Sequence, residues 1–134
     1  MIEQSYLASV FIEIDSSLEE TAKDLNAILG GFNLKDEDSG RFEDLPMFID
    51  EISNIEVRVS GIPEGETRDA YEFSVTTGEA INPLVIGTKI NSPFVKGFTT
   101  NLPVEANGYV NISQYSADYI SSRSTLKCKP AWKI

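Results

Sequence analysis

The stretch SYLASVFIEIDSSLEETAKDLNAILGG, Ser5 to Gly31, decides the fold because it places a strand directly before a capped helix. Its first part, residues 5–14, is rich in β-branched and aromatic residues and has the length of a strand. Nearly every position from Leu7 to Ile12 is apolar. This pattern predicts a central strand that is covered on both faces.

The second part of the stretch has the pattern of an amphipathic helix with signals at both ends. Ser16 and Ser17 are each followed three residues later by a glutamate, Glu19 or Glu20, which is a capping-box signature. Apolar side chains then recur at helical spacing and define one face, namely Leu18, Ala22, Leu25, Ile28 and Leu29. The pair Gly30-Gly31 predicts the end of the helix, since glycine adopts the left-handed conformation of a C-terminal cap.

Two further strands are expected in the middle of the chain. Ile55, Val57 and Val59 alternate with polar residues, and the segment YEFSVTT from residue 71 alternates in the same way. The Gly- and Pro-containing segment between them predicts a turn, so the two strands should form an antiparallel hairpin.

The C-terminal third is harder to interpret. Prolines interrupt residues 80–105, where we expect one short strand over Leu84 to Ile90. A short helix capped by Asn111 or Ser113 should follow. The last element should be a strand with Leu126 and Cys128 on one face and two lysines, Lys127 and Lys129, on the other.

These elements predict a single α+β domain over residues 1–134. We expect a mixed or antiparallel sheet, with one main N-terminal helix and a short C-terminal helix packed on it. The length of 134 residues and the 41% hydrophobic content are sufficient for a packed core without disulfides or metals.

The net charge of −10 is unevenly distributed along the chain. Residues 1–79 hold nineteen Asp and Glu against five Lys and Arg, a net of −14, whereas the remainder is net +4. An acidic surface of this kind repels nucleic acid and anionic membranes and speeds encounter with basic proteins. Solubility alone is the simpler explanation.

Few residues suggest catalysis. The chain has no histidine, so the commonest general base and metal ligand are absent and Ser-His or Cys-His pairs are excluded. The single Cys128 lies between two lysines that could activate it, although a cysteine at an alternating apolar position is usually a packing residue. No glycine-rich phosphate loop opens a helix. A reaction carried out by two carboxylates stays open, but no pair stands out; we expect a protein that is not an enzyme and uses no cofactor.

The segment LKDEDSGRFEDLPMF, Leu34 to Phe48, contains five carboxylates. Read as an EF-hand from Asp36, it has Gly40, Arg41 and Met47 where an acid, a glycine and a glutamate are required, so we expect no metal site. The DSG tripeptide predicts a turn, which Arg41 could hold by pairing with Asp38 or Glu43. A solvated loop or a protein-docking surface remains.

The N-terminus lacks the basic region of a signal peptide, and no apolar run reaches the length of a membrane span. The lone cysteine gives no sign of an oxidising compartment. We therefore expect a cytoplasmic protein that does not contact membrane.

Three segments together resemble the immunity proteins of bacterial contact-dependent growth inhibition systems. They are DSGRFEDLPMF (Asp38 to Phe48), VSGIPEGETRDAYEFSV (Val59 to Val75) and DYISSRSTLKCKP (Asp118 to Pro130). The similarity in order and spacing extends from about residue 8 to residue 130 and is weakest over residues 80–105.

The resemblance implies a cytoplasmic, non-catalytic protein that binds one-to-one to the C-terminal toxin domain of a large exoprotein. Such toxins are often nucleases with basic surfaces. The resemblance supplies no fixed binding residues, so charge selects the expected interface: Asp36, Glu37, Asp38, Glu43 and Asp44 first, then Glu64, Glu66 and Asp69. The alternatives are an acidic nucleic-acid mimic that inhibits another enzyme, and a small structural or assembly protein.

Overall fold

The structure, a computed structural model, describes residues 3–37, 46–63, 65–101 and 109–131. The described residues form seven strands and four helices. In chain order these are β1 (Ser5–Glu13), α1 (Leu18–Leu29), β2 (Lys35–Asp36), β3 (Met47–Ile52), β4 (Ile55–Ser60), β5 (Ala70–Thr77), α2 (Pro83–Lys89), α3 (Pro93–Asn101), β6 (Tyr109–Asn111), α4 (Ser113–Arg123) and β7 (Cys128–Pro130).

All seven strands belong to one mixed sheet with the order β2-β3-β4-β5-β1-β6. Along the run β2-β3-β4-β5-β1 each strand is antiparallel to the next, as the sequence predicts for the β4–β5 pair. The outer edge of β1 is shared by two short strands. β6 pairs in parallel with Ser5 to Leu7, and β7 pairs antiparallel with Val10 to Ile12.

The gap between these two edge strands is closed by a side chain. The backbone N–H of Ser9 donates to the hydroxyl of Ser113, the first residue of α4, at 3.0 Å. On either side the ladder continues, because Ile112 N–H donates to Leu7 O and Ala131 N–H donates to Ser9 O. The hydroxyl of Ser113 thus replaces the missing strand partner of a buried amide.

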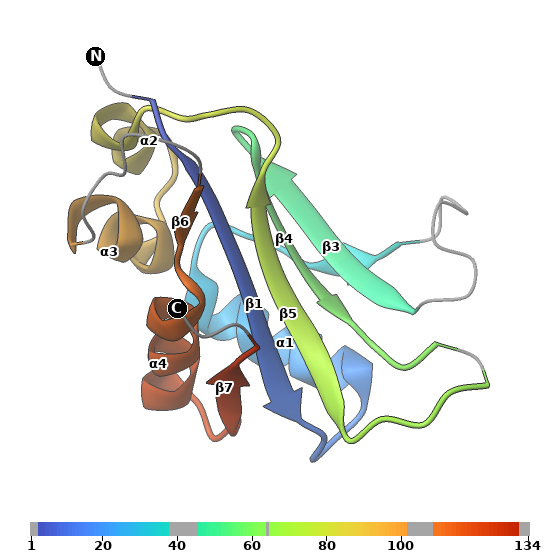
Figure 1. Cartoon of the computed structure of the whole chain (residues 1–134). Helices are drawn as coiled ribbons and strands as arrows, with labels where there is room; N and C mark the ends of the chain where they lie inside the picture. The colour runs from blue at the N-terminus through green and yellow to red at the C-terminus, as the bar shows by residue number, and fades with distance from the viewer. Residues whose placement is uncertain (1–2, 38–45, 64, 102–108, 132–134) are drawn as a thin grey trace.

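One face of the sheet is covered by helices, as Figure 1 shows. α1 contacts β3 and β4, while α4 contacts β1 and β7. The alternate strand residues that face this layer are buried and apolar, for example Val10, Val57 and Phe73, each 0% exposed. The expectation that β1 is covered on both faces is wrong, because none of the four described helices covers its other face (Figure 1) and Phe11 there is 39% exposed.

The covered side holds a cluster of six aromatic rings. Phe94 on α3 is 0% exposed and lies 5.1–6.1 Å, centroid to centroid, from four of them: Phe73, Phe98, Tyr115 and Tyr119. The sixth is Tyr6, whose ring lies 4.8 Å from that of Phe98. Two tyrosine hydroxyls in the cluster donate to backbone carbonyls, Tyr115 to Phe94 O and Tyr119 to Ile28 O. The cluster therefore joins α1, α3 and α4 to the sheet.

The predicted N-terminal helix is confirmed with its caps. Ser17, and not Ser16, is the N-cap, and its hydroxyl accepts from the backbone N–H of Glu20 at 3.1 Å. Gly30 and Gly31 follow the helix with φ of 70° and 76°. A side chain at Gly30 would also collide with Pro93, since an added Cβ would lie 2.7 Å from the proline Cδ.

The expected strand over residues 84–90 is wrong, because this segment belongs to α2. The side chain of Asn82 accepts from Leu84 N–H at 3.0 Å, and Pro83 occupies the first helical turn, where its missing N–H costs nothing. α3 begins similarly at Pro93, where the Ser92 hydroxyl accepts from Val95 N–H and donates to Leu29 O.

The expectation of one main helix and one short helix is therefore also wrong. α4, expected from the sequence, has eleven residues against twelve in α1, and two further helices come from the proline-containing segment. The predicted last strand is found as β7. No helix in the described ranges is long and apolar enough to cross a membrane.

Candidate functional site

The face of the sheet without helices carries mostly polar side chains at its centre. Ser9, Glu72 and Ser74 stand on neighbouring strands, and the Ser9 hydroxyl donates to the Glu72 carboxylate. On β4, Arg58 pairs with Glu56 at 3.7 Å. We call this surface the open face. Its centre is polar but not fully solvated, because Ser9 and Ser74 are buried at 2% and 8% exposure.

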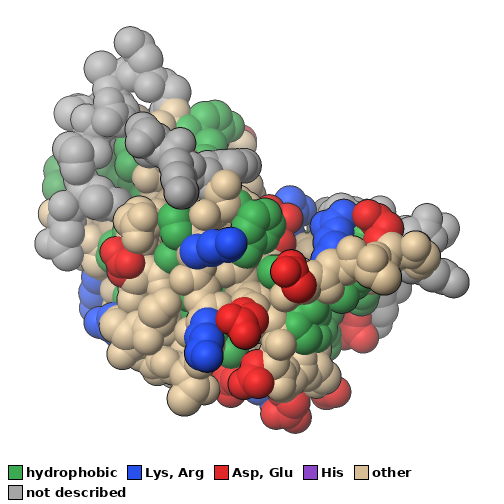
Figure 2. All heavy atoms as spheres, turned by 60° about the horizontal axis from the view of Figure 1, so that its bottom comes forward, with side chains coloured by type: hydrophobic (Ala, Val, Ile, Leu, Met, Phe, Trp, Pro, Cys, Tyr) green, Lys and Arg blue, Asp and Glu red, His purple; other side chains and the backbone are tan. Residues whose placement is uncertain are grey.

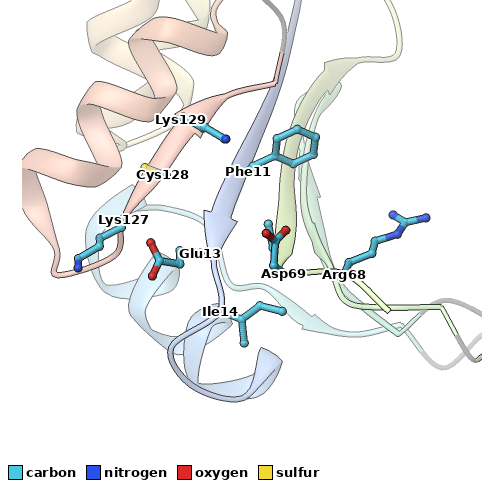
Figure 3. Close-up of a pocket in the computed structure, with 9 residues that line it drawn as sticks. Phe11, Glu13, Ile14, Arg68, Asp69, Lys127, Cys128 and Lys129 are labelled. Atoms are coloured by element: carbon cyan, nitrogen blue, oxygen red, sulfur yellow. The ribbon is translucent and has the colours of Figure 1, made fainter. Parts of the chain in front are cut away.

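At one end of the open face two adjoining hollows, of about 610 and 660 Å³, form a continuous depression that we call the trough. Five residues line both hollows: Phe11, Arg68, Asp69, Ala70 and Lys129. β1 and β7 form one wall, and the segment between β4 and β5 forms the other (Figure 3). The volume is in the range of sites that bind small ligands or an anchoring side chain.

The floor of the trough is apolar. Phe11 on β1 is the aromatic residue that lines both hollows, together with Ala70. Ile14 lines the first hollow, and Met47 lines the second from β3, on the far side of β4 and β5 from Phe11. Figure 3 shows the Phe11 ring and Asp69 projecting on the same side, whereas Arg68 extends away from them. The exposed Phe11 ring and these aliphatic residues give the trough an apolar floor with charged residues at its rim.

The charges at the rim differ in whether they are already paired. Arg68 donates to Glu66 at 3.1 Å, and Arg58 has its partner Glu56. The carboxylates of Glu13 and Asp69 make no side-chain hydrogen bond or ion pair to the rest of the described structure. Figure 2 shows acidic and basic side chains interspersed with apolar ones on the face it presents.

Cys128 borders the first hollow, but its thiol is engaged with α4. The Sγ atom donates to Ala117 O at 3.2 Å and lies 3.0 Å from the Ser121 hydroxyl. Burial raises the pKa of the thiol above its usual value, although the bond from Ser121 acts in the opposite direction. This environment matches the packing role that the alternating pattern predicts.

Four of the eight expected interface residues lie in the described structure. Asp36 is on β2, and the half-buried Glu37 follows it with its backbone N–H donating to Met47 O. Glu66 and Asp69 are exposed in the segment between β4 and β5. Asp38, Glu43, Asp44 and Glu64 lie outside the described residues, as does Arg41 with its expected ion pair.

The acidic residues expected at the interface belong to two segments, one from β2 to β3 and one between β4 and β5. Both segments begin at the same end of the sheet. The backbone N–H of Gly61 donates to Pro46 O at 2.8 Å, which ties the start of one segment to the end of the other. Asp69 reaches the trough, whereas Asp36 and Glu37 do not line it. The structure therefore adds Phe11 and Met47, which charge alone did not select.

Catalytic and metal-binding groups do not assemble in the described structure. Ser9 and Glu72 form a hydroxyl–carboxylate pair, but the chain has no histidine to act as a base for it. No three acidic or cysteine side chains among the described residues are placed to hold a metal ion. The prediction that the EF-hand-like segment holds no metal involves residues 38–45, which lie outside the described residues, so it stays a prediction.

Comparison with protein-family models, with curated proteins and with solved structures finds no match to this chain.

Proposed function

We propose that this protein is an immunity protein that binds and neutralises a basic toxin domain, one-to-one and without catalysis. The toxin would be the C-terminal domain of a contact-dependent growth inhibition exoprotein, and a nuclease is the class that an acidic inhibitor fits best. The sequence resemblance suggests the partner. The arrangement of charge in the fold gives the physical support.

The observation that carries the proposal is the separation of charge between two parts of the fold. The acidic residues 1–79, net −14, build β1 to β5 and α1. The basic remainder, net +4, builds the helices α2 to α4 and the two short strands at the outer edge of β1. A protein with an acidic part of this kind associates rapidly with a basic partner.

An acidic inhibitor suits a nuclease because its carboxylates occupy the surface on which the enzyme binds phosphates. Neutralising a lethal toxin requires that little of it stays free, so the dissociation constant should be nanomolar or lower. A nanomolar constant corresponds to a binding free energy of about −12 kcal/mol. The charge should act mainly on the association rate.

The test is co-expression with the toxin domain encoded by the reading frame immediately upstream. We expect cells to survive and a one-to-one complex to persist through gel filtration. Raising the salt concentration from 0.01 to 1 M shortens the screening length from about 30 to about 3 Å, so association should slow about tenfold or more. Cell death despite this protein, or the absence of a complex, would contradict the proposal.

A second candidate, a small assembly protein, is favoured by one observation. Leu84 and Val85 on α2 are apolar and 84% and 38% exposed. If they form a contact between copies, the protein should sediment as an oligomer, and Leu84→Asp should convert it to a monomer.

A further inference from the structure

The outer side of α2 combines an exposed leucine with a small hollow lined by one acid and one base. We infer that this surface is a two-fold contact between two copies of this chain, in which their α2 helices pack antiparallel. Its residues are Glu3, Leu84, Val85, Thr88 and Lys89, which we call the α2 surface. Such a contact rests on the assembly candidate, the second proposed function, and is independent of immunity.

Leu84 is the most exposed large apolar side chain among the described residues, at 84%. Its neighbour Val85 is 38% exposed, and both lie near the start of α2. Figure 1 shows α2 at the periphery of the fold, away from the connection between β4 and β5. The seven residues of α2 give a helix about 10 Å long, so a second α2 beside it would cover both apolar side chains.

A hollow of about 290 Å³ runs along the same part of α2. From the helix it is lined by Asn82, Val85, Ile86 and Lys89, at the three- and four-residue spacing of one helical stripe. Its other lining residues come from the start of the chain, the β3–β4 turn and the segment after β5, namely Glu3, Ser53, Asn54, Ala80 and Ile81. A hollow this small suits one or two side chains of a protein partner better than a separate ligand.

The acid and the base of the hollow stand at opposite ends of α2. Glu3 precedes Gln4, whose backbone exchanges two hydrogen bonds with Ile81, the residue before the N-cap Asn82. Lys89 is the last residue of the helix. Glu3 and Lys89 are exposed, and neither forms an ion pair within the described structure. The charges of the α2 surface are therefore separated along the helix axis and open to a partner.

This separation makes the surface complementary to itself. In an antiparallel pair of α2 helices, the last turn of each helix lies beside the first turn of the other. Lys89 of each copy then meets Glu3 of the other, and the two-fold axis forms this ion pair twice. Leu84 of each copy packs across the contact on Thr88 and on the methylene stem of Lys89.

The distribution of charge favours a second copy over a basic partner. Residues 80–104 contain two lysines and no Asp or Glu. Two chains of net charge −10 therefore repel each other least when they meet through this part, which belongs to the basic remainder of net +4. A basic partner would be repelled by Lys89, whereas a second copy supplies an acid for Lys89 and a base for Glu3 at once.

The contact leaves the acidic segments and the trough accessible. Its hollow includes the turn Ser53–Asn54 directly before β4, while the trough includes Gly61 directly after β4. The two sites therefore lie at opposite ends of the sheet. Each copy in a dimer can still bind one toxin domain.

The first experiment is sedimentation velocity of the purified chain from about 1 μM to about 1 mM. We expect reversible association that stops at the dimer, because a two-fold contact closes on itself. Leu84→Ala should raise the dimer dissociation constant about tenfold or more, since this side chain is buried twice in each dimer. Phe11→Ala, at an exposed apolar residue of the open face, should leave the constant within about twofold.

The second experiment tests the two-fold pairing by exchanging its charges. Glu3→Lys or Lys89→Glu alone places like charges together twice and should weaken the dimer about tenfold. The double variant should restore it to within about threefold of wild type. An equimolar mixture of the two single variants should form a heterodimer, because both of its pairs are again of opposite charge. Lys23→Glu on α1 changes the net charge as Lys89→Glu does and should leave the dimer intact.

The possible failures differ in what they overturn. A chain that stays monomeric throughout contradicts both the α2 contact and the assembly candidate, and the immunity function stands. A dimer that survives Leu84→Ala, or charge exchanges that show no rescue, contradicts the α2 contact alone. Association that continues beyond the dimer contradicts the two-fold arrangement.

Discussion

The two faces of the same sheet differ in almost every physical respect. On the covered face Val10, Val57 and Phe73 are fully buried against helices. On the open face, at adjacent positions of the same strands, Phe11 is exposed, Arg58 holds an ion pair and Glu72 accepts a serine hydroxyl. Because alternate residues of a strand point to opposite faces, one segment contributes both to the core and to the open face.

This difference between the faces predicts which substitutions should affect the stability of the protein and which should not. Apolar burial supplies most of the folding free energy, so substitutions on the covered face should unfold the protein. The open face carries exposed residues such as Phe11, so substitutions of these residues should cost little stability.

The largest effect should come from Phe94→Ala, which removes the ring at the centre of the aromatic cluster. We expect a loss of about 3–5 kcal/mol in the free energy of unfolding, because the rigid surroundings leave a cavity. Phe11→Ala is the matched open-face variant and should cost less than about 1 kcal/mol. Urea denaturation measures both. Equal losses would remove the distinction between the faces.

A smaller effect is expected at two serines of α4. Ser113→Ala leaves the buried Ser9 amide without its acceptor and should cost about 1–3 kcal/mol. Ser116 is 0% exposed and its hydroxyl has no partner in the described structure, so Ser116→Ala should be neutral or stabilising. A large loss on Ser116→Ala would show that this hydroxyl has a partner that the structure lacks.

The helix cap should have an effect of about 1 kcal/mol. Ser17→Ala removes the acceptor for Glu20 N–H, whereas Ser16→Ala changes an exposed residue whose side chain caps nothing. Thermal unfolding of the two variants compares them directly. Reversing Glu19 and Glu20 to lysine should also destabilise, since cations disfavour a helix N-terminus.

The smallest expected effect is the contribution of Tyr115 to the pH dependence of the free energy of unfolding, which appears only above neutral pH. Burial, reinforced by the neighbouring Tyr119, raises the pKa of the Tyr115 hydroxyl to about 12 from an ordinary value of 10. The folded state therefore holds this proton more tightly than the unfolded chain. Its contribution is complete below pH 10 and is lost as the pH rises toward 12. Urea unfolding between pH 9 and 11.5 should show a steeper decline for wild type than for Tyr115→Phe; equal slopes would contradict the assignment.

The sequence predicts the elements whose signals are local. β1, α1, the β4–β5 pair and β7 follow from alternation, helical spacing and glycine caps. β3 was missed because its apolar residues point to both faces, Phe48 with the core and Ile49 with the open face. Its turn at Ser53 and Asn54, both with positive φ, was the available signal.

The helices α2 and α3 also had local signals that the prolines obscured. Asn82-Pro83 and Ser92-Pro93 are both a capping residue followed by a proline that suits the first turn of a helix. The trough could not be predicted, because it joins β1, β7 and the segment before β5, which are distant in the sequence. Net charge selected Asp69 but gave no reason to select Phe11.

The shared edge of β1 has a consequence for how the protein is made. β1 is synthesised before the other strands, whereas the strands β6 and β7 that complete its edge follow all of them. At translation rates of about 5–20 residues per second, that edge waits on the order of ten seconds for its partners. The nascent chain can pair β1 with β5 in the meantime, but it must keep the other row of β1 amides from meeting another chain until residues 109–130 leave the ribosome.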